Sequence, residues 1–170
     1  LFGPTASGGF TPGPATMRLD GLVASISRSK TIAASPAAVW DVLADFGALS
    51  SWANNVDHSC LLEHDADSAA VGTSRRVQVG RDTLVERITE CRAPATLAYD
   101  IEGLPRRLRR VTNRWTLTPA GANTDVMLTS TVDIGDNPVA DLAERAMCRY
   151  LARQSDTMLS GLAARLEGSL

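Results

Sequence analysis

Residues 29–52 decide the fold of this chain, and they read SKTIAASPAAVWDVLADFGALSSW. The first four letters continue a segment from Leu22 to Ala33, in which Ser and Thr punctuate Val23, Ile26 and Ile32. β-Branched residues with polar punctuation are typical of a half-buried strand. We therefore expect an extended segment over Leu22–Ala33.

The rest of this stretch carries the start signals of a helix. Ser35 is a suitable N-cap, and Pro36 suits the first helical position because its missing N–H would be unpaired there anyway. Gly47 ends the helix, and a short second helix is expected over Ala48–Trp52. The first helix has its apolar residues at helical spacing, at Val39, Trp40, Val42, Leu43 and Phe46.

Six further strands follow, separated by residues that favour turns, such as Gly80-Arg81-Asp82 and Ala93-Pro94. Leu84, Glu86 and Ile88 share one face of their strand by alternation. Short connections between successive strands predict an antiparallel meander. The expected strands are Val56–Glu63, Val71–Val79, Thr83–Glu90, Thr96–Ile101, Arg109–Leu117 and Asp125–Ile134.

A long amphipathic helix is expected at the end of the chain. It opens with Asp136 or Asn137 as cap and Pro138 at its start, and it continues to about Leu166. Gly161 is its weak point, because glycine is a poor helix former. Its apolar side consists of Leu142, Ala146, Tyr150 (or Leu151), Met158, Leu162 and Leu166.

The element order is therefore β, α, α, six β and one long α, which indicates an α+β fold. A curved antiparallel sheet of about seven strands needs cover for its apolar face, and the C-terminal α-helix can provide it. A curved sheet that grips a helix readily leaves an internal cavity, and such cavities are where small ligands bind.

Composition narrows the class of protein. The 170 residues carry 17 basic and 19 acidic side chains, a net charge of −2, and 44% of them are apolar. These values are typical of a soluble globular domain. The near-zero charge argues against a nucleic-acid partner, and no apolar run approaches the length of a membrane helix.

Residues 1–16 hold four Gly, three Pro and no charge. We interpret them as a flexible or cloning-derived leader, with a single domain over residues 17–170. They lack the features of a secretory signal. Three widely spaced cysteines fit free thiols in a reducing compartment, so a cytoplasmic protein is expected. They are Cys60, Cys91 and Cys148.

No nucleophile, phosphate-binding or dinucleotide-binding motif is present in the sequence. His58 and His64 alone do not make a zinc site, which needs three or four organised ligands. We therefore expect no metal and no nucleotide cofactor. A lone His58 could serve as a base, but an exposed or structural role is the simpler interpretation.

Three stretches together resemble a known family. Residues 29–52 resemble the opening of the helix-grip superfamily, which includes the major birch-pollen allergen, START lipid-transfer domains and polyketide cyclases. Val71–Val77 (VGTSRRV) and Leu84–Ile88 (LVERI) are similar to strands of its polyketide cyclase/dehydrase and lipid-transport branch, as is Leu97–Ile101 (LAYDI). The resemblance spans about residues 22–168 and implies that the inward faces of the strands line a cavity.

On that basis, alternation along the strands places Arg75 on the inward face with Thr73 and Val77. In the same way it places Glu86 on the inward face of the next strand. A buried lone charge is costly, so we expect Arg75 and Glu86 to pair. The pair could anchor a ligand carboxylate, hydroxyl or ketone, or it could be purely structural. If the protein is an enzyme, Arg75 would polarise a carbonyl, and Glu86 or Tyr99 would move a proton.

Aromatic side chains with a polar tip suit pockets for ring-containing or acyl ligands. Trp52, Tyr99 and Trp115 are therefore candidate ligand contacts, although aromatic residues at such spacing more often belong to the core. Asn113 lies on the same face of its strand as Trp115 and would need a hydrogen-bond partner if it points inward. Trp40 is assigned to the core.

Four arginines lie within Arg106–Arg110. They could contact an anion, or they could form a solvated strand edge that discourages aggregation. The same region resembles plant abscisic acid receptors, but Arg106 replaces their latch histidine and their gate sequence is missing. A hormone switch is therefore not expected, while Gly103–Arg107 is expected at the rim of the cavity.

Three functions fit these observations. The first is a binding module for a hydrophobic small molecule such as a lipid, a polyketide or an aromatic metabolite. The second is a polyketide aromatase/cyclase or dehydratase that uses the same cavity. The third is a protein-interaction or co-chaperone domain. The protein is expected to be a monomer or a homodimer.

Overall fold

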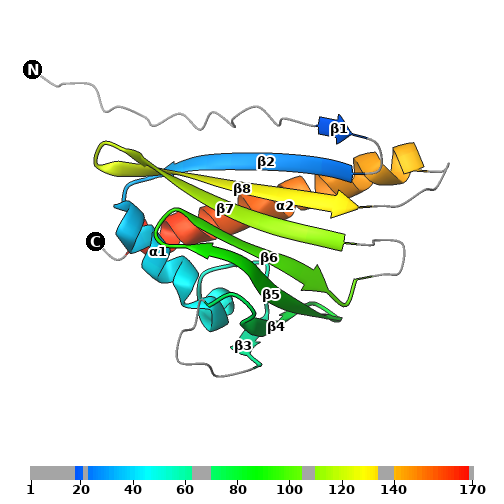
Figure 1. Cartoon of the computed structure of the whole chain (residues 1–170), viewed down its shortest axis with the longest axis horizontal. Helices are drawn as coiled ribbons and strands as arrows, with labels where there is room; N and C mark the ends of the chain where they lie inside the picture. The colour runs from blue at the N-terminus through cyan, green and yellow to red at the C-terminus, as the bar shows by residue number, and fades with distance from the viewer. Residues whose placement is uncertain (1–17, 21–22, 63–69, 105–109, 134–139, 169–170) are drawn as a thin grey trace, which may run out of the picture.

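The computed structural model describes residues 18–20, 23–62, 70–104, 110–133 and 140–168. They form one antiparallel sheet, two α-helices and a short 3-10 helix (Figure 1). In chain order the elements are β1 (Arg18–Asp20), β2 (Val23–Ile32), α1 (Pro36–Ala44), η1 (Phe46–Ser51), β3 (His58–Leu61), β4 (Ser74–Val79), β5 (Asp82–Arg92), β6 (Thr96–Glu102), β7 (Arg110–Ala120), β8 (Asn123–Asp133) and α2 (Ala140–Glu167).

The sheet has eight strands in the order β1-β2-β8-β7-β6-β5-β4-β3. Strands β3 to β8 form the expected meander, and β2 pairs with β8 rather than with β3. The helices α1 and η1 therefore carry the chain from β2 to the far edge of the sheet. Figure 1 shows the sheet curving around α2, so the predicted α+β fold with a gripped C-terminal helix is confirmed.

Local sequence explains the start of α1. The Ser35 hydroxyl accepts a hydrogen bond from the Ala38 N–H at 3.2 Å, and Pro36 occupies the first turn, as expected. The helix ends at Ala44 rather than at Gly47, and the chain tightens into η1 directly afterwards. Residues Phe46 and Gly47 thus lie in η1, where their carbonyl groups face other elements.

The core lies between the concave face of the sheet and the helices. On β8 the inward row runs through Val126, Leu128 and Val132, all fully buried. Helix α2 contributes Leu159 and Leu162 to this core, and Gly161 lies against the backbone of Trp52. The weak point expected at Gly161 is therefore a site of close approach, since a Cβ atom there would lie 2.1 Å from the Trp52 carbonyl oxygen.

Some expected boundaries shift. The expected strand Val71–Val79 begins at Ser74, because residues 70–73 turn into it. A three-residue strand, β1, precedes the first expected strand. Tyr150 is exposed rather than part of the apolar side of α2, which Leu151 continues. The expected cap of this helix, and residues 1–16, lie outside the described residues, so the proposed leader stays a prediction.

Candidate functional site

An internal cavity of about 590 Å³ lies between the concave sheet face, the segment that follows η1, and α2. Most of its lining is apolar, with Leu49, Val77, Ile101, Val111 and Met158 among the contributors. A few polar groups interrupt this surface. A cavity of this size and character is typical of sites for small organic ligands.

The mouth of the cavity lies where its lining residues are exposed. Asp82 at the β4–β5 turn, Gly103 after β6 and Tyr150 on α2 all reach solvent, and Leu104 is half-buried beside them. The opening is therefore between two strand ends and the first half of α2. Gly103 and Leu104 belong to the expected rim, whereas residues 105–107 lie outside the described part of the chain.

Arg75 and Glu86 form a buried ion pair at the inner wall. They lie directly opposite each other on β4 and β5, and their exposed fractions are 3% and 5%. Arg75 Nε and Nη2 contact the same oxygen, Glu86 Oε2, at 2.6 and 2.5 Å. The pairing that the sequence predicts is thus present in the structure, and each charge offsets the desolvation of the other.

The remaining surface of the Arg75 guanidinium is also occupied. Its Nη1 donates to the Phe46 carbonyl oxygen at 2.7 Å, and its carbon lies 3.8 Å from the centre of the Phe46 ring. The Tyr99 ring lies 5.0 Å away, within the range of a cation–π contact. Arg75 is therefore enclosed by a carboxylate, a carbonyl group and two aromatic rings.

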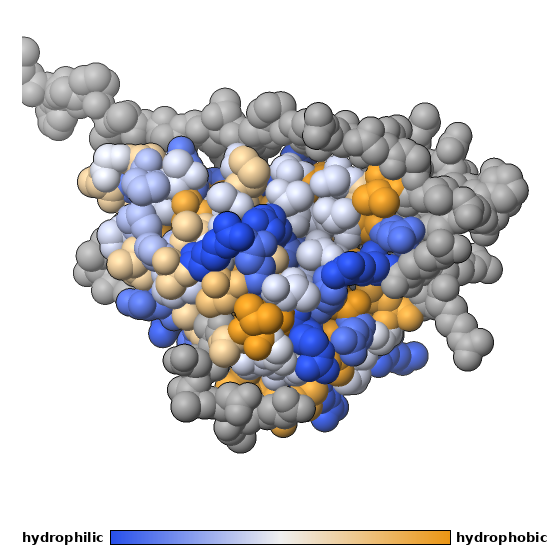
Figure 2. All heavy atoms as spheres, in the orientation of Figure 1, coloured by the Kyte–Doolittle hydropathy of each residue, from blue (hydrophilic) through white to orange (hydrophobic). Residues whose placement is uncertain are grey.

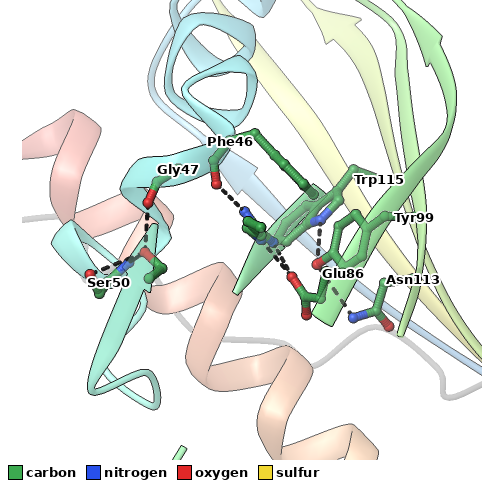
Figure 3. Close-up of polar contacts among 9 residues, drawn as sticks. Phe46, Gly47, Ser50, Glu86, Tyr99, Asn113 and Trp115 are labelled. Carbon is green, nitrogen blue, oxygen red and sulfur yellow. Dashed lines mark hydrogen bonds and ion pairs between the residues drawn. The ribbon is translucent and has the colours of Figure 1, made fainter. Parts of the chain in front are cut away.

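A serine holds η1 in the position that this enclosure requires. Ser59 on β3 donates to the Gly47 carbonyl oxygen at 2.7 Å and accepts from the Ser50 N–H at 2.8 Å. These bonds, drawn in Figure 3, fix the turn that presents the Phe46 carbonyl to Arg75. The site thus depends on a residue two strands away from Glu86.

Tyr99 links the charged pair to a second polar group. Its hydroxyl oxygen accepts long hydrogen bonds from Asn113 Nδ2 at 3.4 Å and from Trp115 Nε1 at 3.5 Å. Burial, together with the nearby Glu86 carboxylate, raises the pKa of Tyr99 to about 12. Tyr99 therefore remains protonated at neutral pH and is a poor general base.

Asn113, Ser130 and Ser155 form a polar chain across β7, β8 and α2. The Ser130 hydroxyl donates to Asn113 Oδ1 at 2.7 Å and lies 3.5 Å from the Ser155 hydroxyl. All three residues are buried and all three line the cavity. Figure 3 shows the Asn113 amide pointing toward Tyr99, on the side of that ring where Glu86 also lies.

Apart from the charged Asp82 at the mouth, four uncharged polar lining residues were not predicted from the sequence, namely Asn55, Ser130, Gln154 and Ser155. Asn55 Nδ2 donates to Gln154 Oε1, which ties the segment after η1 to α2. The sequence does mark Ser130 and Ser155, because each is a polar residue at a position where the helix or strand periodicity expects an apolar one. Ser155 lies between Leu151 and Met158 at helical spacing, and Ser130 interrupts the inward row of β8.

Two of the six predicted site residues, Glu86 and Asn113, line the cavity. Arg75, Tyr99 and Trp115 lie behind them, joined to them by the contacts above, and are not part of the lining. Trp52 is also outside the lining. Its ring packs edge-on against Trp115 with centres 6.1 Å apart, and its Nε1 has no hydrogen-bond partner in the described structure.

The other sequence candidates lie away from the cavity. His58 is exposed on β3, Cys60 is a half-buried free thiol, and Cys91 is half-buried. The side chain of Cys148 and all of His64 lie outside the described part. Among the described residues, no three or more His, Cys, Asp or Glu side chains gather where they could hold a metal ion.

The outer face of the sheet is strongly charged, and Figure 2 shows hydrophilic side chains gathered there. Arg110 is the one residue of the arginine run that the structure describes, and Asp100 both binds it at 2.7 Å and raises its pKa. Arg114 likewise pairs with Glu90, and this lowers the pKa of Glu90. Arg110 is thus part of a solvated strand surface, and Arg106–Arg109 lie outside the described residues.

Sequence comparison identifies one matching family. The sequence model of the family described as polyketide cyclase / dehydrase and lipid transport matches residues 23–167. No curated protein matches the chain. In the described structure, no helix is both long and apolar enough to span a membrane.

Similar folds occur in several solved structures. The Zhui aromatase/cyclase from Streptomyces sp. R1128 shares 20% identity with a TM-score of 0.70, covering 85% of this chain and 94% of that one. A START superfamily protein from Mycobacterium smegmatis shares 14% identity with a TM-score of 0.70, covering 86% and 99%.

The di-domain ARO/CYC StfQ of the steffimycin biosynthetic pathway shares 16% identity with a TM-score of 0.72, and the match covers 87% of this chain and 52% of that one. At such identities the likeness shows the fold alone.

Proposed function

We propose, because this chain belongs to the polyketide cyclase / dehydrase and lipid transport family, that its cavity binds a hydrophobic small molecule for transport or storage. Candidate ligands are a lipid, a polyketide or another aromatic metabolite. The observation that supports this proposal most strongly is the cavity of about 590 Å³ with a mostly apolar lining. Transfer of an apolar ligand from water into such a space is favourable by roughly 25 cal/mol for each Å² buried.

The arrangement of the lining supports a binding role. The polar groups at the inner wall are bonded mainly to one another, so the site is already organised before a ligand arrives. A preorganised site loses less free energy to ordering when it binds. The opening beside Tyr150 gives a ligand access without unfolding of the sheet.

The test combines native mass spectrometry with thermal unfolding of the full chain. The mass of freshly purified protein reports any co-purified ligand and distinguishes a monomer from a homodimer. A panel of lipids and polyphenols is then expected to raise the melting temperature for at least one class. Protein that carries no ligand and shows no shift across the panel would contradict the proposal.

An enzymatic function is the second candidate, and the position of Glu86 favours it. This carboxylate lines the cavity and could accept a proton from an activated carbon of a poly-β-ketone. Two of the solved structures with the same fold are described as aromatase/cyclases. Arg75 is enclosed and Tyr99 holds its proton, so the enzymatic proposal rests on Glu86 as base.

Conversion of a linear poly-β-ketone by the purified protein tests this second function. Activity that Glu86→Gln lowers by about a hundredfold or more, while Glu90→Gln leaves it unchanged, would support catalysis. Glu90 is the matched control because it lies on the same strand and points outward to Arg114. No conversion, or equal conversion by both variants, would remove the catalytic role.

A further inference from the structure

We infer that the cavity selects uncharged ligands that carry a hydroxyl donor, either an alcohol or a phenol, and discriminates against carboxylates. The inference deepens the proposed function and rests on it. Glu86 is the residue that sets this selectivity, because it offers a hydrogen-bond acceptor to the ligand.

The cation of the pair does not face the ligand. Arg75 is absent from the lining, and all three of its guanidinium nitrogens bond to Glu86 or to the Phe46 carbonyl oxygen. The Phe46 ring covers the guanidinium at 3.8 Å. A ligand carboxylate would therefore meet no free guanidinium at this wall, although the sequence alone left a carboxylate anchor open.

The anion of the pair does face the ligand. Both Arg75 contacts use Glu86 Oε2, and no hydrogen bond to Oε1 occurs within the described residues. Glu86 is buried yet lines the cavity, so Oε1 is an acceptor on the cavity side. Carboxylate oxygens accept hydrogen bonds strongly, and a ligand O–H group is the complement.

The rest of the lining agrees with this charge pattern. In the described part of the cavity wall, no Lys, Arg or His is present, and the second charged residue, Asp82, is also acidic. A carboxylate would lose its hydration there without gaining a cation, at a large cost in free energy. A ligand amine would also bind Glu86 less strongly than it would bind an isolated carboxylate. The Arg75 guanidinium directly behind Glu86 offsets the negative charge.

A matched set of three probes tests the inference on the wild-type chain: para-octylphenol, para-octylanisole and para-octylbenzoate. The three share one apolar body and differ in the donor, its methylated form and a carboxylate. We expect the phenol to bind about tenfold or more tightly than either of the other two, as measured by titration calorimetry. That ratio is the usual loss for one hydrogen bond to a charged group.

Protein variants place the effect on Glu86. Glu86→Gln is expected to weaken binding of the phenol by about tenfold and to leave binding of the anisole unchanged. Glu90→Gln is expected to change neither affinity. If Glu86→Gln does not fold, the probe series on the wild-type chain still decides the question.

The outcomes separate the two proposals. Anisole or benzoate binding as tightly as the phenol would overturn the selectivity while leaving the cavity as a binding site. Failure of all three probes would overturn the selectivity as well. If a neutral fluorescent probe, N-phenylnaphthylamine, also fails to bind, the proposed function falls with it.

Discussion

At the scale of single residues, the Arg75–Glu86 pair controls both stability and ligand preference. Two opposite charges that are almost fully buried are stable only together, since either one alone is desolvated without compensation. Arg75→Met is therefore expected to lower the free energy of unfolding by about 3 to 5 kcal/mol. Urea unfolding followed by circular dichroism measures the loss.

A double-mutant cycle supplies the control for this prediction. Arg75→Met combined with Glu86→Leu removes both charges and is expected to cost clearly less than the sum of the two single changes. Simple additivity would show that the two residues do not depend on each other, against the contacts of 2.5 and 2.6 Å between them.

Tyr99 gives a prediction about pH. Because burial raises its pKa from 10.0 to about 12, an unfolded chain releases this proton at a lower pH than the folded chain does. The protonated Tyr99 therefore contributes fully to the free energy of unfolding below pH 10. As the pH rises toward 12 this contribution is lost, and the free energy of unfolding falls by up to about 2 to 3 kcal/mol. Tyr99→Phe should remove this part of the decline, as seen in urea unfolding at pH 9 and pH 11.5. Parallel pH profiles for the two proteins would contradict the assignment.

The sequence predicts part of this residue-scale picture. Alternation on two strands joined by a short turn is enough to place Arg75 opposite Glu86 and to suggest their pairing. The enclosure of Arg75 is not predictable in the same way, because it depends on the Phe46 carbonyl of η1. That carbonyl is in place only through the bonds that Ser59 makes from another strand.

At the scale of elements, the contact of α2 with the segment after η1 fixes the width of the cavity. Gly161 allows this contact, since any Cβ there would meet the Trp52 carbonyl oxygen at 2.1 Å. Helix propensity alone predicts that Gly161→Ala stabilises the helix by about 1 kcal/mol. We expect the opposite sign, a loss of about 2 kcal/mol or more, because backbone must move.

Thermal unfolding of Gly161→Ala measures this effect, and Ser160→Ala is its control. Ser160 is the preceding residue on the same helix and is exposed, so its substitution should leave the melting temperature unchanged or slightly raised. A stabilised Gly161→Ala protein would show that the helix is not held against Trp52.

The polar residues on the inward face of α2 show what the periodicity of a helix can and cannot predict. Leu151 and Met158 mark the inward face, and that spacing correctly places the helix on the sheet. Gln154 and Ser155 lie on the same face, yet periodicity alone does not distinguish a polar residue that bonds within a cavity from one that is tolerated at an edge. Their partners, Asn55 and Ser130, come from distant segments.

At the scale of the whole molecule, the curvature of the sheet around α2 creates the space that we assign to a ligand. The order of strands and helices predicts this curvature and the gripped helix. The volume of about 590 Å³ follows from how closely α2 approaches, which no local pattern encodes. The ligand chemistry then follows from the orientation of one ion pair.

Binding of N-phenylnaphthylamine to three forms of the full chain, followed by the fluorescence of the probe, tests whether the internal cavity is the binding site. Leu84→Trp places a large ring in the cavity, whereas Val85→Trp adds the same ring one residue later on the outer face of β5. We expect the wild type and Val85→Trp to bind the probe alike and Leu84→Trp to bind it at least about tenfold more weakly. Equal binding by all three folded proteins would contradict the claim that the internal cavity is the binding site.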